Sequence, residues 1–450
     1  MRTLQQAFLA ITLASLGCSI ASAQDLTRVS PVQTRAVAIV GAMVHPVSAP
    51  EIPDGVVFFA DGKFDRVGTA AEWADFKSRA RFAAPGPLEI DAKGKHVWPG
   101  MISASTQLGL AEMASIRASR DTDEAGDITP EARATAAVNP DSTLLPVARS
   151  NGILLAGVFP TGGVISGQPG VIRLHGWTVE DLAVQPSCGV YLQWPFMRTP
   201  QGMEDRDRED QSRDLRKRLA TVTDAVDQAR AYAKQSPGAP IDLRWEGMRA
   251  AMEGKARVFI QANDIDQIAS AVAFCAERSL KCVIVGGRDA MMAVELLKSH
   301  DVPVIIMGTH KLPKRGDSAY DESYTLPKRL RDAGVKFCIT SGHESSRERN
   351  LPYHAATAVA YGLSADDAMK SVTLWPAEIM GIADRYGTIE AGKSATMIIT
   401  SGNPLETTTK VERAFIDGRE VDLRNKQTEL YEKYREKYRQ RGELKDEARP

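Results

Sequence analysis

Histidine and cysteine, two residue types that often bind transition metals, are scarce in this sequence of 450 residues, which has seven histidines and five cysteines. Four of the cysteines follow residue 24, and no two of them have the C-x-x-C spacing of a metal or redox site. Cys282 and Cys338 lie within apolar runs, where cysteine is more typical of a small buried hydrophobe than of a ligand. The sequence alone does not decide whether Cys275 and Cys282 form a disulfide.

An excess of either charge is also absent, since 56 basic side chains balance 57 acidic ones and the formal net charge is −1. This balance excludes a global field that would collect nucleic acid or anionic lipid. Beyond the N-terminus no run approaches the roughly 20 apolar residues of a membrane-spanning helix. We therefore expect no nucleic-acid partner and no membrane span, and a small molecule is the expected ligand.

The N-terminus has the composition of an export signal. A basic residue precedes an apolar run from Ala7 to Gly17, and Ala21-Ser22-Ala23 supplies small residues at the spacing that signal peptidase recognises. We predict a cleavable signal peptide over residues 1–23 and hence a periplasmic or secreted protein. Lipidation at Cys18 is the alternative, but the residue three positions before it is not the usual leucine.

Residues after this signal are typical of a globular protein, with 43% hydrophobic and 25% charged side chains over the whole chain. The length exceeds what one compact core usually fills, which favours a large scaffold with an accessory domain. Short strand-like runs separated by turn residues occupy residues 37–67, and a similar pattern returns over residues 386–418. We expect these two ends to share one sheet.

Between the two ends, apolar runs alternate with helical segments such as 266–278 and 290–300. The predicted strands are Val258–Ala262, Cys282–Gly286, Val302–Met307 and Val335–Thr340. This alternation indicates parallel βα units, as in a closed barrel. A doubly wound open sheet is the structural alternative, although no G-x-G-x-x-G phosphate loop follows the first barrel-like strand.

Two segments carry charges at helical spacing, residues 204–219 and 425–441. The second also repeats apolar and aromatic side chains, namely Leu430, Tyr431, Tyr434 and Tyr438. Solvated helices are the simplest interpretation of both segments. For the tail, packing on the protein body and packing on another subunit are equally compatible with the aromatic stripe.

The order of several motifs resembles imidazolonepropionase-like members of the amidohydrolase superfamily. The resemblance covers residues 36–421 and rests on three groups of motifs. The first is the opening I-V-G-A-M-V with D-G-V-V-F-F-A-D-G-K, and the second is the run G-K-H-V-W-P-G-M-I at 94–102. The third is T-L-W-P-A at 373–377, followed by G-T-I-E-A-G-K-S-A. The resemblance implies an α/β fold in which a (β/α)8 TIM-like barrel is joined to a small β-sandwich. The corresponding boundaries are 24–97 and 385–424 for the two parts of the sandwich, 98–384 for the barrel and 425–450 for a charged helical tail.

Residues 387–394 formally match the phosphate-binding pattern G-x-x-x-x-G-K-[ST]. A phosphate loop opens a helix, whereas this segment precedes the β-like run 395–400. We therefore reject nucleotide binding at this position.

The resemblance also implies a divalent metal such as zinc at the carboxyl ends of the barrel strands, where it would make hydroxide from water at neutral pH. The expected H-x-H is Ser105-x-Gln107 in this sequence. Histidines expected after later strands are replaced by Gln261-Ala262-Asn263 and by Gly286-Gly287, and Gly342 or His343 stands where the family has an aspartate. The metal ligands are missing, so we predict no metal-binding residue.

Two histidines and one glutamate follow strands whose ends would face the barrel mouth, and we take these as candidate catalytic residues: His310, His343 and Glu344. Polar or glycine positions at other strand ends, and in the glycine-rich loop that follows the run at 151–158, are candidate substrate-binding residues: Ser105, Gln107, Gln261, Asn263, Gly163 and Gln168. The alternative is that these residues have no role in catalysis or binding and are ordinary loop residues or turn glycines.

Two functions fit this pattern. The family resemblance implies a hydrolase of non-peptide C–N bonds in cyclic amide-like small molecules, working with an atypical or lost metal site. The missing ligands favour instead an inactive paralogue that binds a ligand or pairs with an intact amidohydrolase homologue, as a hetero-oligomer or a homo-oligomer. A periplasmic solute-binding protein is a third possibility, but such proteins hinge between two α/β lobes.

Overall fold

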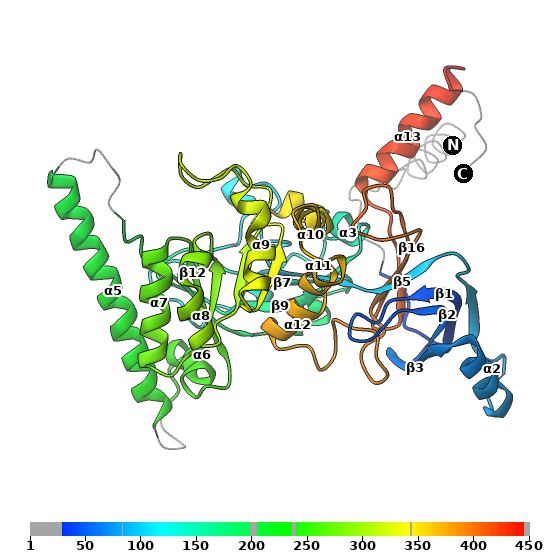
Figure 1. Cartoon of the computed structure of the whole chain (residues 1–450), viewed down its shortest axis with the longest axis horizontal. Coiled ribbons are helices and arrows are strands. Elements are labelled where there is room, and N and C mark those ends of the chain that lie inside the picture. Colours follow the sequence, from blue (N-terminus) through cyan, green and yellow to red (C-terminus); the bar gives the residue numbers. More distant parts are fainter. Residues whose placement is uncertain (1–28, 83, 199–204, 236–239, 343, 445–450) are drawn as a thin grey trace, which may run out of the picture.

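The computed structural model describes residues 29–82, 84–198, 205–235, 240–342 and 344–444. The predicted signal peptide at 1–23 and the candidate His343 lie outside the described residues. The described chain folds into three sheets surrounded by helices, and Figure 1 shows one sheet with β1, β2 and β3 at one end of the molecule and helix α5 at the other.

The first sheet joins the two ends of the chain, as the sequence predicts. It contains β1 (Val37–Val44), β2 (Ile52–Ala60), β3 (Lys63–Thr69), β4 (Leu88–Asp91), β5 (His96–Pro99), β16 (Met397–Thr400), β17 (Val411–Ile416) and β18 (Arg419–Val421). Its order is β18-β17-β16-β5-β1-β2-β3, with β4 beside β1. The antiparallel pairing of β5 with β16 connects the two ends, because Val97 and Trp98 lie opposite Ile399 and Ile398.

The second and third sheets form the middle of the molecule. The second has the order β10-β9-β7-β6 and the third β15-β14-β13-β12-β11-β8. Their strands are β6 (Met101–Thr106), β7 (Ile153–Val158), β8 (Ile165–Gly167), β9 (Gly170–Arg173), β10 (Ala183–Gln185), β11 (Gly189–Gln193), β12 (Arg257–Ala262), β13 (Lys281–Gly286), β14 (Val304–Met307) and β15 (Phe337–Thr340). Strands β11 to β15 are parallel to one another, as is β6 to β7, whereas β8 is antiparallel to β11.

Helices follow most of the parallel strands, which confirms the alternation expected from the sequence. They are α2 (Ala70–Arg79), α3 (Leu144–Arg149), α4 (Val179–Leu182), α5 (Asp205–Ala233), α6 (Leu243–Met252), α7 (Ile265–Glu277), α8 (Val294–Ser299), α9 (Glu322–Asp332), α10 (Leu351–Ala360), α11 (Ala365–Ser371), α12 (Leu374–Met380) and α13 (Lys426–Gln440), with 3-10 turns at Arg117–Ser119, Ala134–Ala137, Ala290–Ala293 and Ser345–Asn350. The predicted strand runs agree with β12 to β15 within two residues at each end.

The seam between the second and third sheets lies where β6 meets β15. The Thr340 hydroxyl at the end of β15 donates to the Ser105 carbonyl in β6 at 2.8 Å. One hydrophobic core spans both sheets and includes Phe159, Tyr191 and Phe259, whose rings meet edge to face at about 5 Å. Near-continuous burial of the parallel strands follows from helices covering them.

The two charged segments differ in their surroundings. Helix α5 extends well beyond the predicted 204–219, and its carboxyl half buries Val222, Val226 and Ala229. Helix α13 has no buried residue, and Figure 1 shows it projecting from the body. Packing of the aromatic stripe on the body is therefore not observed, and packing on another subunit stays a prediction.

The cysteines beyond the signal segment behave as small hydrophobic residues. Cys188, Cys275, Cys282 and Cys338 are buried and free, so Cys275 and Cys282 form no disulfide with each other in this structure. The neighbouring Cys275 thiol and burial both raise the pKa of Cys282. Burial also raises the pKa of Cys188 and Cys338, so the thiols of Cys188, Cys282 and Cys338 are poor ligands and poor nucleophiles.

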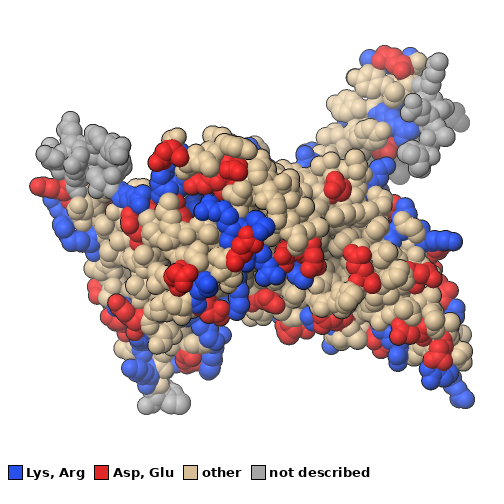
Figure 2. Space-filling model, in the orientation of Figure 1, with Lys and Arg blue, Asp and Glu red and all other residues tan. Residues whose placement is uncertain are grey.

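The visible surface has no large patch of one charge. Figure 2 shows basic and acidic side chains interspersed over this face of the molecule, in keeping with the net charge of −1. None of the helices in the described part of the chain combines the length and the apolar character that a bilayer crossing requires.

Candidate functional site

The carboxyl ends of β6 and β15 meet at a group of buried hydroxyls. Ser105 is completely buried, and its hydroxyl, like those of Ser103 and Ser341, has no hydrogen bond of normal geometry within the described residues. Gln107 follows β6 and is partly exposed, and its carbonyl accepts from the backbone of the next turn. The structure therefore places hydroxyls and an amide where the sequence comparison expects imidazoles.

A carboxyl group that the sequence did not indicate lies at the same seam. Glu348, in the 3-10 turn after β15, is only 1% exposed. Burial raises its pKa, while the nearby hydroxyls of Ser103, Thr106 and Ser341 lower it. Neither carboxyl oxygen makes a hydrogen bond of normal geometry with a described residue. No motif marks Glu348 because it lies eight residues beyond the strand, in a segment that sequence alone does not place.

The end of β12 is occupied by packing and backbone contacts. The Gln261 side-chain oxygen accepts a hydrogen bond from the Tyr191 hydroxyl at 2.9 Å, and Tyr191 belongs to the aromatic cluster with Phe159 and Phe259. Asn263 follows Gln261, and its carbonyl accepts from the Lys314 ammonium at 3.4 Å. Gln261, in β12, is thus held by the Tyr191 side chain, and Asn263, just beyond β12, is held by Lys314.

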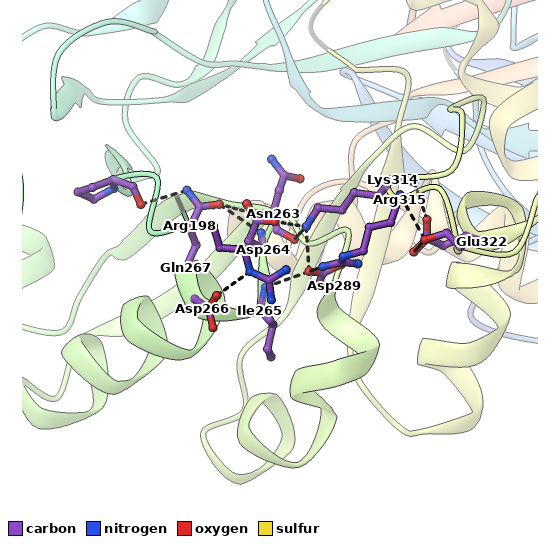
Figure 3. Close-up of polar contacts among 12 residues, drawn as sticks. Arg198, Asn263, Asp264, Ile265, Asp266, Gln267, Asp289, Lys314, Arg315 and Glu322 are labelled. Carbon is purple, nitrogen blue, oxygen red and sulfur yellow. Dashed lines mark hydrogen bonds and ion pairs between the residues drawn. The ribbon is translucent and has the colours of Figure 1, made fainter. Parts of the chain in front are cut away.

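Figure 3 shows an ionic network at the ends of β12 and β13, joined by the loop after β14. The Asp289 side chain is fully buried, and its carboxylate accepts a hydrogen bond from the Lys314 ammonium at 2.8 Å. It also accepts hydrogen bonds from the two Nη atoms of Arg315 at 3.0 and 2.5 Å. Lys314 also pairs with Asp264, whose side chain is 8% exposed. Burial would raise the pKa of Asp289, but hydrogen bonds from Arg315 and Lys314 hold it below its usual value.

This network was accessible to sequence reasoning but was missed. Asp264 and Asp289 each follow a predicted strand by a few residues, and Lys314 and Arg315 follow the next one. Carboxyl ends of parallel strands meet at one edge, so opposite charges there are expected to pair. These four charged residues are not among the predicted site residues.

Residues at these strand ends do not fit the divalent metal that the family implies. Within the described residues, no group of three histidine, cysteine, aspartate or glutamate side chains could hold a metal ion. The carboxylates nearest the strand ends, Asp264 and Asp289, are already neutralised by Lys314 and Arg315. Zinc sites usually have three protein ligands. A metal ion beside Lys314 and Arg315 would also be repelled by these two cations.

His310 and Glu344 have different surroundings, and in the described part of the chain no hydrogen bond joins them. The His310 Nε2 atom lies 2.7 Å from the Thr357 hydroxyl, and its ring packs against His354 at 4.0 Å between centroids. Burial lowers the pKa of His310. Glu344 is 65% exposed and pairs with Arg347 at 2.7 Å. Their catalytic role stays a prediction.

Gly163 and Gln168 hold a neighbouring loop in place. Gly163 has φ of +59°, and a Cβ there would lie 2.8 Å from the Asp127 carbonyl oxygen. The Gln168 side chain donates to the Pro130 carbonyl at 2.8 Å. Both residues therefore fasten the segment around 126–132 against β8, and their binding role stays a prediction.

Comparisons with known proteins agree with this architecture. A model of the amidohydrolase family matches residues 266–421. The amidohydrolase tasK of Hapsidospora irregularis is 23% identical over 376 residues, which cover 76% of this chain and 38% of tasK. The structure of an amidohydrolase from Thermotoga maritima MSB8 has a TM-score of 0.73 at 23% identity and covers 86% of this chain and 100% of that chain.

The chain resembles amidohydrolases in sequence over residues 266–421 and in fold over most of its length. A more distant structure, that of a molinate hydrolase, has a TM-score of 0.53 at 14% identity and covers 87% of this chain and 96% of that chain. These structural likenesses show a shared mixed α/β fold. The family model agrees over residues 266–421 with the family predicted from the sequence, and this chain spans 38% of the length of tasK.

Proposed function

We propose that this amidohydrolase-family protein has lost metal-dependent hydrolysis and acts as a binding or partner subunit of an active amidohydrolase homologue. One observation carries the proposal: the strand ends where the family holds metal present Ser105 and Gln107, and the carboxylates nearby are paired with Lys314 and Arg315. Hydroxyl and amide groups are weak zinc ligands, and two fixed cations oppose binding of a third.

Helix α13 supports the partner role. Its aromatic and apolar side chains are exposed by 40% for Leu430, 63% for Tyr431, 48% for Tyr434 and 40% for Tyr438. They recur at spacings of three and four residues and so share one side of the helix. Aromatic residues are enriched in interfaces, so an exposed tyrosine stripe is a candidate contact with an intact amidohydrolase chain.

Metal loading tests the proposal. Purified protein would be dialysed against zinc, manganese and iron in turn, and bound metal would be measured by mass spectrometry beside an intact H-x-H amidohydrolase treated in the same way. We expect the control to load fully and this chain to stay far below one ion per chain. Stoichiometric loading of this chain, with turnover of an amide, would overturn the proposal.

A pull-down with the intact homologue tests the partner role separately. We expect a complex to form with the full chain and to be lost when Tyr431, Tyr434 and Tyr438 are changed to serine. A chain that stays metal-free and also binds no homologue would retain the first part of the proposal and refute the second.

A hydrolase of cyclic amide C–N bonds is the second candidate, and the neutral imidazole of His310 favours it. A histidine whose pKa is lowered by burial is uncharged near neutral pH and can accept a proton. Assays with lactams and hydantoins would decide. We would expect turnover that His310→Ala abolishes and Lys336→Gln leaves unchanged, and no turnover by the wild-type protein would exclude this candidate.

The finer architecture is also a proposal. The parallel order of β11 to β15, the parallel pair β6 and β7, and the bond from Thr340 to Ser105 support closure into a (β/α)8 barrel. The eight-stranded sheet supports an accessory β-sandwich built by both ends of the chain. Export to the periplasm or medium rests on residues 1–23, and mass spectrometry of the mature N-terminus tests it.

A further inference from the structure

A cavity lies at the end of the parallel strands opposite to the ionic network. It is bounded by the first residues of β12 and β15, the segments leading into β14 and β15, and the helices α9 and α12. Its volume is about 430 Å³, which is within the roughly 300–1,000 Å³ typical of small-molecule sites. Its charged and aromatic lining residues are Arg257, Asp301, Arg331, Lys336, Trp375 and Glu378.

Arg257 is the cation in this cavity that lacks a carboxylate partner. Its Nη2 atom donates to the Glu378 carbonyl at 3.1 Å, and within the described part of the chain it makes no ion pair. The guanidinium has five N–H donors, so most of its hydrogen-bonding capacity is unused by these contacts. Burial lowers its pKa, opposed by Asp301, Cys188 and Glu378, which indicates that the charge is only partly solvated.

The other two cations of the lining are already paired. Arg331 binds Asp367 at 3.0 Å, and Lys336 binds Asp301 at 2.9 Å. A bound anion would therefore form its strongest ion pair with Arg257, because the planar guanidinium can donate two parallel hydrogen bonds to a carboxylate. The carboxylates of Asp301 and Glu378 would repel a second negative charge on the same ligand.

Apolar surface accompanies this cation. The Trp375 ring contacts Phe337 edge to face at 5.1 Å, and the Arg331 guanidinium lies 5.5 Å from the Trp375 centroid. Val335 and Ile379 complete an apolar side of the lining. A planar apolar group could be buried against these side chains while a charged group meets Arg257.

We propose that this cavity binds a small organic monoanion in which one carboxylate is attached to a planar apolar group. The carboxylate pairs with Arg257, and the apolar group packs against Trp375, Val335 and Ile379. The site is separate from the strand ends where the family's metal lies, so it does not depend on whether the protein is catalytic.

Calorimetric titration with benzoate and phenylacetate tests the proposal, with benzamide and phenylacetamide as neutral counterparts of the same shape. We expect saturable binding of at least one carboxylate, about tenfold tighter than its amide, because tenfold corresponds to roughly 1.4 kcal/mol for a charged contact. Binding should weaken as salt rises, since a partly exposed charge pair is screened.

Matched variants assign the contact to a residue. Arg257→Gln should weaken carboxylate binding about tenfold, whereas Lys336→Gln removes a cation of the same lining that already has a partner and should leave binding nearly unchanged. If Arg257→Gln does not fold by circular dichroism, Arg257→Lys and the comparison of acid with amide on the wild-type protein still decide. Equal binding of acid and amide, full binding by the Arg257 variant, or no saturable binding of either carboxylate would overturn the proposal.

Discussion

Two buried carboxyl groups in this protein, those of Glu348 and Asp289, are stabilised in opposite ways. Glu348 lies beside the hydroxyls of Ser103, Thr106 and Ser341, and burial raises its pKa. Asp289 has Lys314 and Arg315 beside it, and its pKa is lowered. Burial without a neighbouring cation thus raises the pKa of one carboxyl group, whereas paired cations outweigh burial and lower the pKa of the other.

The Glu348→Gln variant should gain stability relative to wild type as pH rises. Because the native pKa lies above the ordinary value of 4.5, the carboxyl favours the folded state fully below pH 4.5, and that contribution is lost as pH rises through the native pKa. Urea unfolding between pH 4 and 8 measures the difference. Glu344→Gln, at an exposed carboxylate, is the control, and a pH-independent difference for Glu348→Gln would contradict the assignment.

Replacing Asp289 by asparagine should be strongly destabilising at pH 7. It leaves Lys314 and Arg315 partly buried without the carboxylate that pairs with both of them, and breaking a buried pair costs about 3–5 kcal/mol. Since the native pKa is lowered, the loss should shrink as pH falls below the ordinary value of 3.8. Asp266→Asn removes an exposed pair with Arg198 and should cost below about 1 kcal/mol. Equal costs at the two positions would refute the network.

At the scale of elements, α5 and α13 show that similar charge patterns have different outcomes. Both helices carry charges at helical spacing, yet α5 buries Val222, Val226 and Ala229 while α13 buries nothing. Asn425 begins α13 and also donates to the Ser150 hydroxyl at 3.0 Å, which attaches the start of the helix to the body. The stability of α13 in solution therefore depends on its capping and on what covers its tyrosines.

A stop after Asn425 should leave the body folded and abolish association. No α13 side chain is buried, so its loss should change the midpoint of thermal unfolding by only about 2 °C. Size-exclusion chromatography with light scattering measures the assembly. Serine at Tyr431, Tyr434 and Tyr438 keeps the helix and removes the stripe, and an unchanged mass for both variants would rule out α13 as an interface.

For the whole molecule, the important connection is the sheet shared by the two ends of the chain. Strand β16 fills the position beside β5, and Met397, Ile399 and Phe415 are buried in the same core as Val57 and Phe59. The middle of the chain is thus enclosed between two segments that must find each other during folding. Such non-local pairing makes the sheet cooperative with the rest of the protein.

A stop after Ser394 should prevent folding to a soluble product. It removes β16 to β18, and three buried apolar side chains at about 1.5–3 kcal/mol each approach the entire stability of a typical domain. Soluble yield and circular dichroism measure the outcome, with the stop after Asn425 as the matched control. A folded, soluble product of the shorter chain would show that the sheet does not need its C-terminal strands.

The sequence predicted the strands β12 to β15 and the shared sheet, because apolar periodicity and turn residues are local signals. The family was implied by the resemblance of several motifs. The sequence also predicted that serine, glutamine and glycine replace the family's metal ligands. It did not indicate Glu348. The positions of Asp289, Lys314 and Arg315 after predicted strands suggest that opposite charges meet at one edge, but which side chains pair depends on contacts between different βα units. Side-chain neighbours across strand ends depend on register and loop path, which no single segment encodes.

The sequence by itself therefore determined which strands and helices form in the middle of the chain and which residue types stand at the strand ends. Only the tertiary structure decided that Lys314 occupies the space beside Asp264 and Asp289, that Glu348 is buried among hydroxyls, and that Arg257 faces a cavity at the opposite end of the strands. The physical reason is that periodicity and turn chemistry act over a few residues, whereas burial and charge pairing depend on segments brought together by the packed core.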